Sequence, residues 1–262
     1  MRQSAPPYVE GHGLLKNKSV LITAAAGAGI GFAAARKAIE EGCRAIVISD
    51  IHERRLGDAV DRLREIGPDT PVRGLLCNVT REDEVQALVT TAEEELGGID
   101  VLVNNAGLGG LKNVVDMTDE EWSLVLDVTL TGTMRMTRAA LRVMIPRKAG
   151  VIVNNASVLG WRAQKGQAHY AAAKAGVMAL TRCSALEAAE HGIRINAVSP
   201  SIAMHDFLKK ASPQEELDKL ASLEAFGRAA EVWEVANVMM FLASDYSGYM
   251  TGEIVSVSSQ RA

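Results

Sequence analysis

Three side chains near the middle of the chain have the types and spacing needed to move a proton to or from an oxygen. Tyr170 and Lys174 are four residues apart, and Ser157 lies thirteen residues before Tyr170. Residues i and i+4 share a face of an α-helix, so a phenol and an ammonium would meet there. A free tyrosine keeps its proton until about pH 10, and a neighbouring cation lowers that pKa. With a serine hydroxyl orienting the substrate oxygen, this group could interconvert an alcohol and a ketone.

An isolated Tyr-x-x-x-Lys pair is more often plain helix surface, so the interpretation depends on the elements that position it. Apolar, β-branched runs occupy residues 19–23, 45–50, 72–77, 101–104, 151–154, 193–198 and 254–257. Amphipathic, helix-like stretches follow the first three runs, at residues 32–41, 53–66 and 81–96. This alternation predicts an α/β fold with a doubly wound parallel sheet of Rossmann type and helices on both faces. We expect a single domain over residues 17–262, preceded by a loose arm of residues 1–16.

Composition narrows the function classes. The chain has 262 residues, 48% of them hydrophobic, and a net charge of −4, which gives no support for nucleic-acid binding. Cys43, Cys77 and Cys183 show neither CxxC spacing nor a nearby His partner, so we predict no disulfide framework and no metal site. No run approaches ~18 apolar residues, so we predict no membrane association and a soluble, cytoplasmic protein.

A glycine-rich loop follows the first apolar run and precedes the first helical stretch. It reads Thr23-Ala-Ala-Ala-Gly27-Ala-Gly29-Ile30-Gly31. Glycines at a strand–helix turn let the backbone approach a pyrophosphate at the helix N-terminus. Asp50 ends the second run, where a carboxylate can bind the adenosine ribose hydroxyls and repel a 2′-phosphate. We therefore predict NAD as the cofactor rather than NADP, with Arg54 and Arg55 as the counter-argument.

Taken together, the motifs resemble those of short-chain dehydrogenases/reductases from about residue 16 to the end. The resemblance depends on the glycine loop, Asn104-Asn105-Ala106-Gly107, Ser157, the Tyr170/Lys174 pair, and Asn196-Ala-Val-Ser-Pro200. It implies that Ser157 positions the substrate oxygen, Tyr170 transfers the proton, and Lys174 lowers the Tyr170 pKa and binds the nicotinamide ribose. The implied cofactor-binding residues are Thr23, Gly27, Gly29, Ile30, Gly31, Asp50, Asn78, Val79, Asn105, Ala106, Gly107, Tyr170, Lys174, Pro200 and Ala203.

The chain departs from the family pattern at several positions. Ala24 replaces the first glycine of a loop that is also one residue longer, and Asn78 replaces an aspartate near adenine. Thr129 stands where many relatives have an asparagine that holds a water in a proton relay to the lysine. We expect Thr129 to act as a fourth catalytic residue in an altered relay. His205 stands near the position at which relatives often have a threonine that contacts the cofactor amide.

The substrate pocket is expected to be apolar, with Leu108, Leu159, Trp161 and Gln167 contacting the substrate. Arg162 and Lys165 could meet an acidic group at its rim, and residues 200–210 could form a lid. Residues 154–203 also resemble an actinobacterial subgroup, some of whose members act on hydroxyacyl-CoA intermediates of steroid ring breakdown. A bulky acyl thioester fits the predicted pocket.

Three functions remain open at this point. The first is oxidation of a secondary alcohol, including a hydroxyacyl-CoA, by an NAD-dependent dehydrogenase. The second is reduction of a 3-oxoacyl thioester, carried on acyl carrier protein or CoA, by an NADPH-dependent enzyme. The third is a non-catalytic nucleotide sensor or scaffold. The partner is a small molecule in the first two cases. The Ala-rich stretch 170–191 favours a homo-oligomer, and the family resemblance implies a dimer or tetramer.

Overall fold

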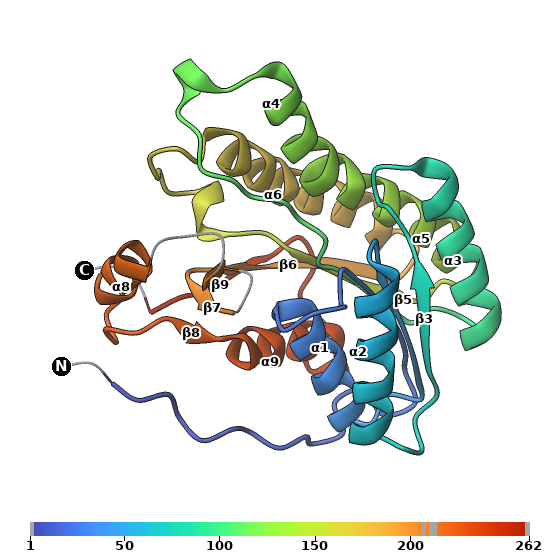
Figure 1. Cartoon of the computed structure of the whole chain (residues 1–262). Coiled ribbons are helices and arrows are strands. Elements are labelled where there is room, and N and C mark those ends of the chain that lie inside the picture. Colours follow the sequence, from blue (N-terminus) through green and yellow to red (C-terminus); the bar gives the residue numbers. More distant parts are fainter. Residues whose placement is uncertain (1–2, 206–207, 210–213, 260–262) are drawn as a thin grey trace.

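Seven parallel strands form one sheet in a computed structural model that describes residues 3–205, 208–209 and 214–259 (Figure 1). The sheet order is β3-β2-β1-β4-β5-β6-β9. The strands are β1 (Ser19–Thr23), β2 (Ala45–Asp50), β3 (Val72–Leu76), β4 (Val101–Asn104), β5 (Gly150–Asn155), β6 (Ile193–Pro200) and β9 (Ile254–Val257). The predicted strands are confirmed, with ends that differ by two residues at most. The largest difference is in β6, which continues to Pro200 because Ser199 and Pro200 pair with β9.

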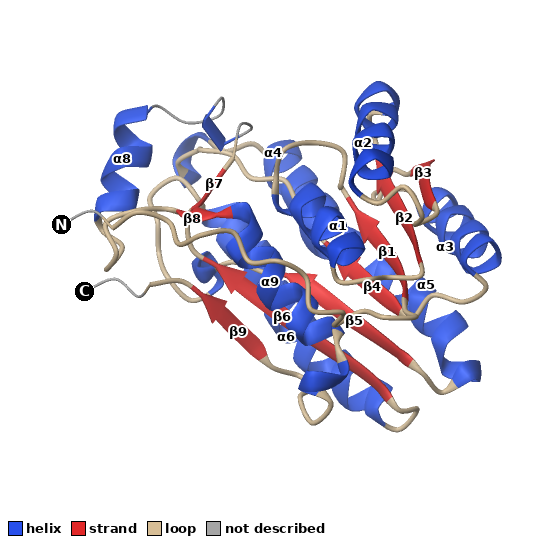
Figure 2. Cartoon of the chain, turned by 90° about the horizontal axis from the view of Figure 1, so that it is seen from below, coloured by secondary structure: helices blue, strands red, loops and turns tan. Residues whose placement is uncertain are grey.

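Helices cover both faces of the sheet, as predicted (Figure 2). They are α1 (Ile30–Glu40), α2 (Glu53–Ile66), α3 (Glu82–Leu96), α4 (Asp119–Leu126), α5 (Gly132–Arg147), α6 (Ala168–Ala189), α8 (Gln214–Ser222) and α9 (Val232–Ala243). Alternate strand residues face opposite sides, so Val20 and Ile22 join the apolar core beneath α1, α2 and α9. Leu21 joins the second core, beneath α3, α5 and α6. The fold is therefore a three-layer, doubly wound α/β domain.

The sheet has its topological switch point between β1 and β4. Strand β1 lies between β2 and β4, so the chain winds outward in opposite directions from this pair. Ligands of doubly wound sheets bind in the crevice outside the carboxyl ends of such strands. Thr23, Asn104 and Asn155 end β1, β4 and β5 at this edge.

The N-terminal arm has no helix or strand over residues 3–12, but it is held against α1. The Tyr8 hydroxyl donates to the Glu40 carboxylate at 2.5 Å, and its ring packs edge-on against Trp233 with centroids 5.2 Å apart. Two cations of α1, Arg36 and Lys37, lie over the same ring. The expectation of a loose arm was based on composition alone, and these contacts correct it because they hold Tyr8 against α1 and Trp233.

The region after β6 continues through β7 (Ala203–Met204), β8 (Ala230–Glu231) and helix α8. Part of the predicted lid, residues 206–207 and 210, lies outside the described residues. None of the helices in the described ranges is both long and apolar enough to cross a membrane.

Candidate active site

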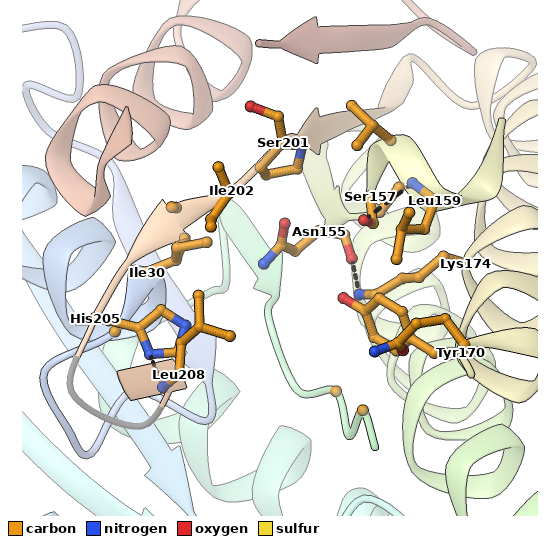
Figure 3. A pocket seen from close by; sticks show the side chains of 18 of the residues that line it. Ile30, Asn155, Ser157, Leu159, Tyr170, Lys174, Ser201, Ile202, His205 and Leu208 are labelled. Carbon is orange, nitrogen blue, oxygen red and sulfur yellow. Dashed lines mark hydrogen bonds between the residues drawn. The ribbon is translucent and has the colours of Figure 1, made fainter. Parts of the chain in front are cut away.

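Helix α6 and the end of β5 bring the three predicted catalytic side chains together (Figure 3). Tyr170 and Lys174 lie one turn apart on α6, and the Lys174 Nζ is 5.5 Å from the centre of the Tyr170 ring. Ser157 follows β5, and its hydroxyl accepts a hydrogen bond from the Leu159 N–H at 3.2 Å. Lys174 is almost fully buried and donates to the backbone carbonyl of Asn155 at 2.5 Å. The i, i+4 geometry predicted for the pair is confirmed.

Burial dominates the electrostatics of this group. It raises the pKa of Tyr170 to about 12, against a smaller lowering by hydrogen bonding to Ser157. Burial also lowers the pKa of Lys174 to about 8, because an ammonium is poorly solvated there. The lowering of the Tyr170 pKa by Lys174 that the resemblance implies stays a prediction, and burial acts on this pKa in the opposite direction. At neutral pH the Tyr170 phenol is protonated and Lys174 is mostly charged. Tyr170 is therefore in the form that can donate a proton to a substrate oxygen.

Thr129 lies in a π-helical turn, Asp127–Thr131, between α4 and α5. It is fully buried, and its hydroxyl accepts from the Leu108 N–H at 3.0 Å and donates to the Leu108 carbonyl at 3.2 Å. Its own carbonyl accepts from the Thr133 hydroxyl at 2.7 Å. The side chain thus holds the chain after β4, and its part in a proton relay stays a prediction.

The glycine loop packs closely against the end of β4. Ala24 has a φ of 51°, the left-handed region that favours glycine, and its carbonyl accepts from the Asn105 side-chain amide at 3.0 Å. Gly31 leaves no room for a side chain, because an added Cβ would collide with the Ala24 carbonyl and with Asn105. The Thr23 hydroxyl accepts from the backbone N–H groups of Asn105 and Ala106. Ala24 therefore takes a backbone conformation that glycine adopts more readily.

Asp50 reaches the glycine loop from the end of β2. Its carboxylate accepts from the Ala26 N–H at 3.3 Å and from the His52 N–H at 3.1 Å. The Arg55 guanidinium is 3.7 Å away. Burial raises the pKa of Asp50, while the bond from Ala26 and the charge of Arg55 oppose the rise. The Asp50 carboxylate and the Arg55 guanidinium thus lie close together where the adenosine half of the cofactor is predicted to bind.

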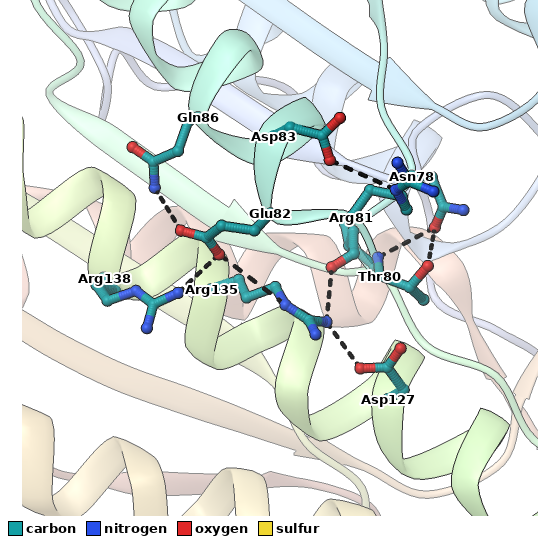
Figure 4. A network of polar contacts seen from close by, with 10 residues as sticks. Asn78, Thr80, Arg81, Glu82, Asp83, Gln86, Asp127, Arg135 and Arg138 are labelled. Carbon is teal, nitrogen blue, oxygen red and sulfur yellow. Dashed lines mark hydrogen bonds and ion pairs between the residues drawn. The ribbon is translucent and has the colours of Figure 1, made fainter.

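Asn78 and Val79 lie in the loop after β3, beside a network of charged side chains (Figure 4). The Asn78 side-chain oxygen accepts from the Thr80 N–H and hydroxyl at 3.0 and 2.8 Å. The Val79 carbonyl accepts from Arg135, which also pairs with Asp127 at 2.7 Å. This network connects the predicted adenine-binding loop to the π-helical turn.

A cavity of about 440 Å³ lies between the glycine loop and the catalytic group. Of the predicted cofactor and catalytic residues, it is lined by Gly29, Ile30, Gly31, Asn105, Gly107, Ser157, Tyr170, Lys174, Pro200 and Ala203. Of the predicted substrate residues, Leu159 and Gln167 line it, whereas Leu108 and Trp161 are not among its lining residues. Trp161 points outward and is 52% exposed. Ile202 and Leu208, from the segment expected to form a lid, also line it. Leu111, Leu217 and Leu220 add apolar surface that the motifs did not indicate.

Two asparagine pairs, Asn104-Asn105 and Asn154-Asn155, end the neighbouring strands β4 and β5. The Asn104 amide donates to the Asn154 side-chain oxygen at 2.9 Å, and the Asn154 amide donates to the Thr181 hydroxyl at 2.9 Å. The Asn155 amide donates to the Asn105 side-chain oxygen at 3.0 Å. Sequence reasoning missed Asn155, although the repeated Asn-Asn pair at two strand ends was a signal for it.

The residues present fit a nicotinamide dinucleotide. An added Cβ at Gly27 would meet no atom within 4 Å, and at Gly29 only the His205 ring at 4.0 Å, so the loop borders open space. Helix α1 begins directly after Gly29, so its first N–H groups face that space. Among the residues with described positions, no cluster of His, Cys, Asp and Glu could hold a metal ion.

Comparisons with known proteins identify the family of this chain. A family model described as enoyl-(acyl carrier protein) reductase matches residues 24–259. The (5R,7aS)-5-hydroxy-7a-methyl-1-oxo-2,3,5,6,7,7a-hexahydro-1H-indene-carboxyl-CoA reductase of Mycobacterium tuberculosis is 62% identical over 98% of this chain and 97% of its own. The 3-oxoacyl-[acyl-carrier-protein] reductase FabG of Vibrio cholerae is 36% identical over 93% and 97%. The crystal structure of a short chain dehydrogenase from Mycobacterium smegmatis is 60% identical, with a TM-score of 0.88 and 99% coverage of both chains.

The chain belongs to the short-chain dehydrogenase/reductase family. It is an oxidoreductase that acts on a CH–OH group or the corresponding ketone. The family uses NAD or NADP.

Proposed function

We propose that this enzyme interconverts a ring ketone and a ring alcohol on a bulky, fused-ring acyl-CoA, with NAD(H) as its cofactor. The observation that carries the proposal is the cavity that Ser157, Tyr170 and Lys174 share with the glycine loop. The substrate class comes from the Mycobacterium tuberculosis relative, whose name specifies a hydroxylated, oxo-substituted indene-carboxyl-CoA.

The catalytic group acts on the substrate oxygen. A bound nicotinamide supplies or removes the hydride at the substrate carbon. In the reductive direction, the Tyr170 phenol gives its proton to the oxygen, and the Ser157 hydroxyl donates a hydrogen bond to the same atom. Charge that develops there is stabilised by two donors. The raised pKa of Tyr170 supports this direction, since the phenol is in its acid form at neutral pH.

The cavity suits a bulky apolar ring system. Leu159, Leu217 and Leu220 line it together with Gln167, whose amide can bond a ring oxygen. Lys112 and Lys165 each follow a lining residue in the sequence, Leu111 and Gln164. Lys112 pairs with Glu121 at 3.2 Å, and Lys165 is exposed. Lys165 is thus available to an acidic group such as a CoA phosphate.

Asp50 supports NAD rather than NADP. Its carboxylate stands at the end of β2 where the adenosine ribose hydroxyls are bound in this fold. A 2′-phosphate would place negative charge beside it. The Arg55 guanidinium is 3.7 Å from the Asp50 carboxylate and partly compensates the negative charge of Asp50.

The proposal is tested by offering the purified enzyme the relative's indene-carboxyl-CoA substrate pair and acetoacetyl-CoA, each with NADH and NADPH. We expect turnover of the fused-ring thioester with NADH, and poor turnover of the small straight chain. Tyr170→Phe should lower kcat about 10²- to 10⁴-fold while NADH still binds. Preference for acetoacetyl-CoA with NADPH would favour the oxoacyl-thioester reductase instead. NADH binding without turnover of any thioester would favour the nucleotide sensor.

A further inference from the structure

The side chain of Asn155 has only one orientation compatible with its hydrogen bonds. The carbonyl of Ala24 can only accept, so the Asn105 side chain must direct its NH₂ group toward it. The Asn105 side-chain oxygen then faces Asn155, so Asn155 must direct its own NH₂ group toward Asn105. The order of donors therefore assigns the orientation of both amides. The Asn155 Oδ1 is left pointing away from this chain of bonds.

That oxygen is buried and has no hydrogen-bond partner within the described part of the chain. Asn155 lines the cavity, and Figure 3 places its side chain between Ile30 of the glycine loop and the Ser157/Tyr170/Lys174 group. A buried acceptor without a donor costs about 1–3 kcal/mol. Such a cost is rare in native proteins unless a ligand or water removes it. The position of Asn155 on the cavity wall makes a ligand the natural donor.

The location of Asn155 decides which part of a ligand would meet it. Its backbone carbonyl accepts from Lys174, and Ser157 is two residues further along the chain, so it lies at the catalytic end of the cavity. Its side chain is connected through Asn105 to the glycine loop, where a diphosphate is expected. The intermediate part of a nicotinamide dinucleotide is the nicotinamide riboside, which carries donors in its ribose hydroxyls and carboxamide.

We propose that the Asn155 Oδ1 accepts a hydrogen bond from the nicotinamide riboside half of the bound cofactor. Asn155 then has two functions at once: its oxygen contacts the cofactor, and its NH₂ group supports Asn105 and the glycine loop. The proposal requires that a nicotinamide dinucleotide binds, and it is independent of the substrate proposed above.

Binding of NADH and of ADP, measured by calorimetry, separates the two functions. ADP has the adenosine and the diphosphate but lacks the nicotinamide riboside. Asn155→Leu keeps the side-chain size but removes both the oxygen and the NH₂ group. We expect it to weaken NADH binding roughly 3- to 10-fold more than ADP binding, as for one lost hydrogen bond to the nicotinamide riboside. Any weakening of ADP binding measures the lost support of Asn105 and the glycine loop.

Asn105→Leu is the matched control, because it removes the bond to the Ala24 carbonyl and should weaken both ligands to a similar degree. Asn155→Ala repeats the test with a smaller side chain in case leucine disturbs the fold, and thermal unfolding verifies each variant. Equal weakening of NADH and ADP in both Asn155 variants would overturn the proposal, since Asn155 would then act only through the loop. Unchanged NADH affinity would overturn it as well.

Discussion

The Lys174 ammonium and the Asn155 backbone carbonyl form a hydrogen bond of 2.5 Å inside the cavity. This bond holds the cation beside the Tyr170 ring and connects helix α6 to the end of β5. One carbonyl is a small replacement for the water that a lysine loses on burial. The pKa of Lys174 accordingly falls from 10.5 to about 8.

The enzyme should therefore lose reductive activity as the pH rises through about 8. Above this pH Lys174 becomes neutral and no longer stabilises charge at Tyr170 or binds a ribose hydroxyl strongly. The phenol of Tyr170 keeps its proton until about pH 12, so it does not titrate in the same range. The measurement is kcat/KM for ketone reduction against pH. A profile that stays level past pH 8 and falls only near the Tyr170 pKa would contradict this assignment.

Folding stability should change with pH in the opposite direction. The folded pKa of Lys174, about 8, is below its ordinary value of 10.5, so between these values the unfolded chain binds more protons. The free energy of unfolding therefore rises with pH over this range. Lys174→Met lacks the ionisation, and the difference in unfolding free energy between the native enzyme and this variant should show the rise. A pH-independent difference would mean that Lys174 is not desolvated.

Asp50→Asn should shift cofactor preference toward NADPH. The substitution removes the charge that disfavours a 2′-phosphate and frees Arg55, which is 3.7 Å from the carboxylate. Loss of a charged hydrogen bond to the ribose should weaken NADH binding roughly 10-fold, while NADPH binding improves. The ratio of dissociation constants measures the effect. Asp50→Asn combined with Arg55→Ala is the control, and it should lose the gain for NADPH.

Ala24→Gly should stabilise the protein by about 1 kcal/mol, because Ala24 has a left-handed φ of 51°. The side chain of Ala24 is exposed, so little packing is lost. Urea unfolding measures the change. Ala25→Gly is the matched control: Ala25 is fully buried with an ordinary φ, and the same change should destabilise there. A loss of stability in Ala24→Gly would show that the loop is not strained.

Local patterns were enough to predict the strands, the helices α1, α2, α3 and α6, and the positions of the catalytic group. Apolar runs and the i, i+4 spacing are local properties, and parallel strands place their carboxyl ends at one edge. Asp50 could be placed next to the glycine loop for the same reason. These features depend on backbone topology, which the hydrophobic pattern specifies.

Features that depend on tertiary burial could not be predicted in the same way. The rise in the Tyr170 pKa requires knowledge of how completely α6 is covered. The outward direction of Trp161 and the inward direction of Leu217 depend on how segments distant in sequence pack. The π-helical turn that contains Thr129 carries no marker such as proline or glycine within its five residues.

The contacts of the N-terminal arm are another feature that could not be predicted from local patterns, and they lead to the last prediction. Tyr8 joins α1 and α9 through its hydroxyl bond to Glu40 and its ring contact with Trp233. Tyr8→Phe should cost about 1 kcal/mol of unfolding free energy, because it removes one hydrogen bond to a charged, partly exposed group. Tyr8→Ala should cost more, since it also removes the aromatic and cation–π contacts.

Tyr249 is the matched control, because its side chain is fully exposed and Tyr249→Ala should leave stability unchanged. Limited proteolysis distinguishes a loosened arm from a weakened core: Tyr8→Ala should speed cleavage within residues 3–12, while Tyr8→Phe should have a smaller effect. Equal cleavage rates in the native enzyme and Tyr8→Ala would mean that the arm is free in solution, as its composition alone had suggested. The contacts of Lys37 with the Val9 carbonyl and of Glu41 with the N–H groups of His12 and Leu14 predict the opposite result.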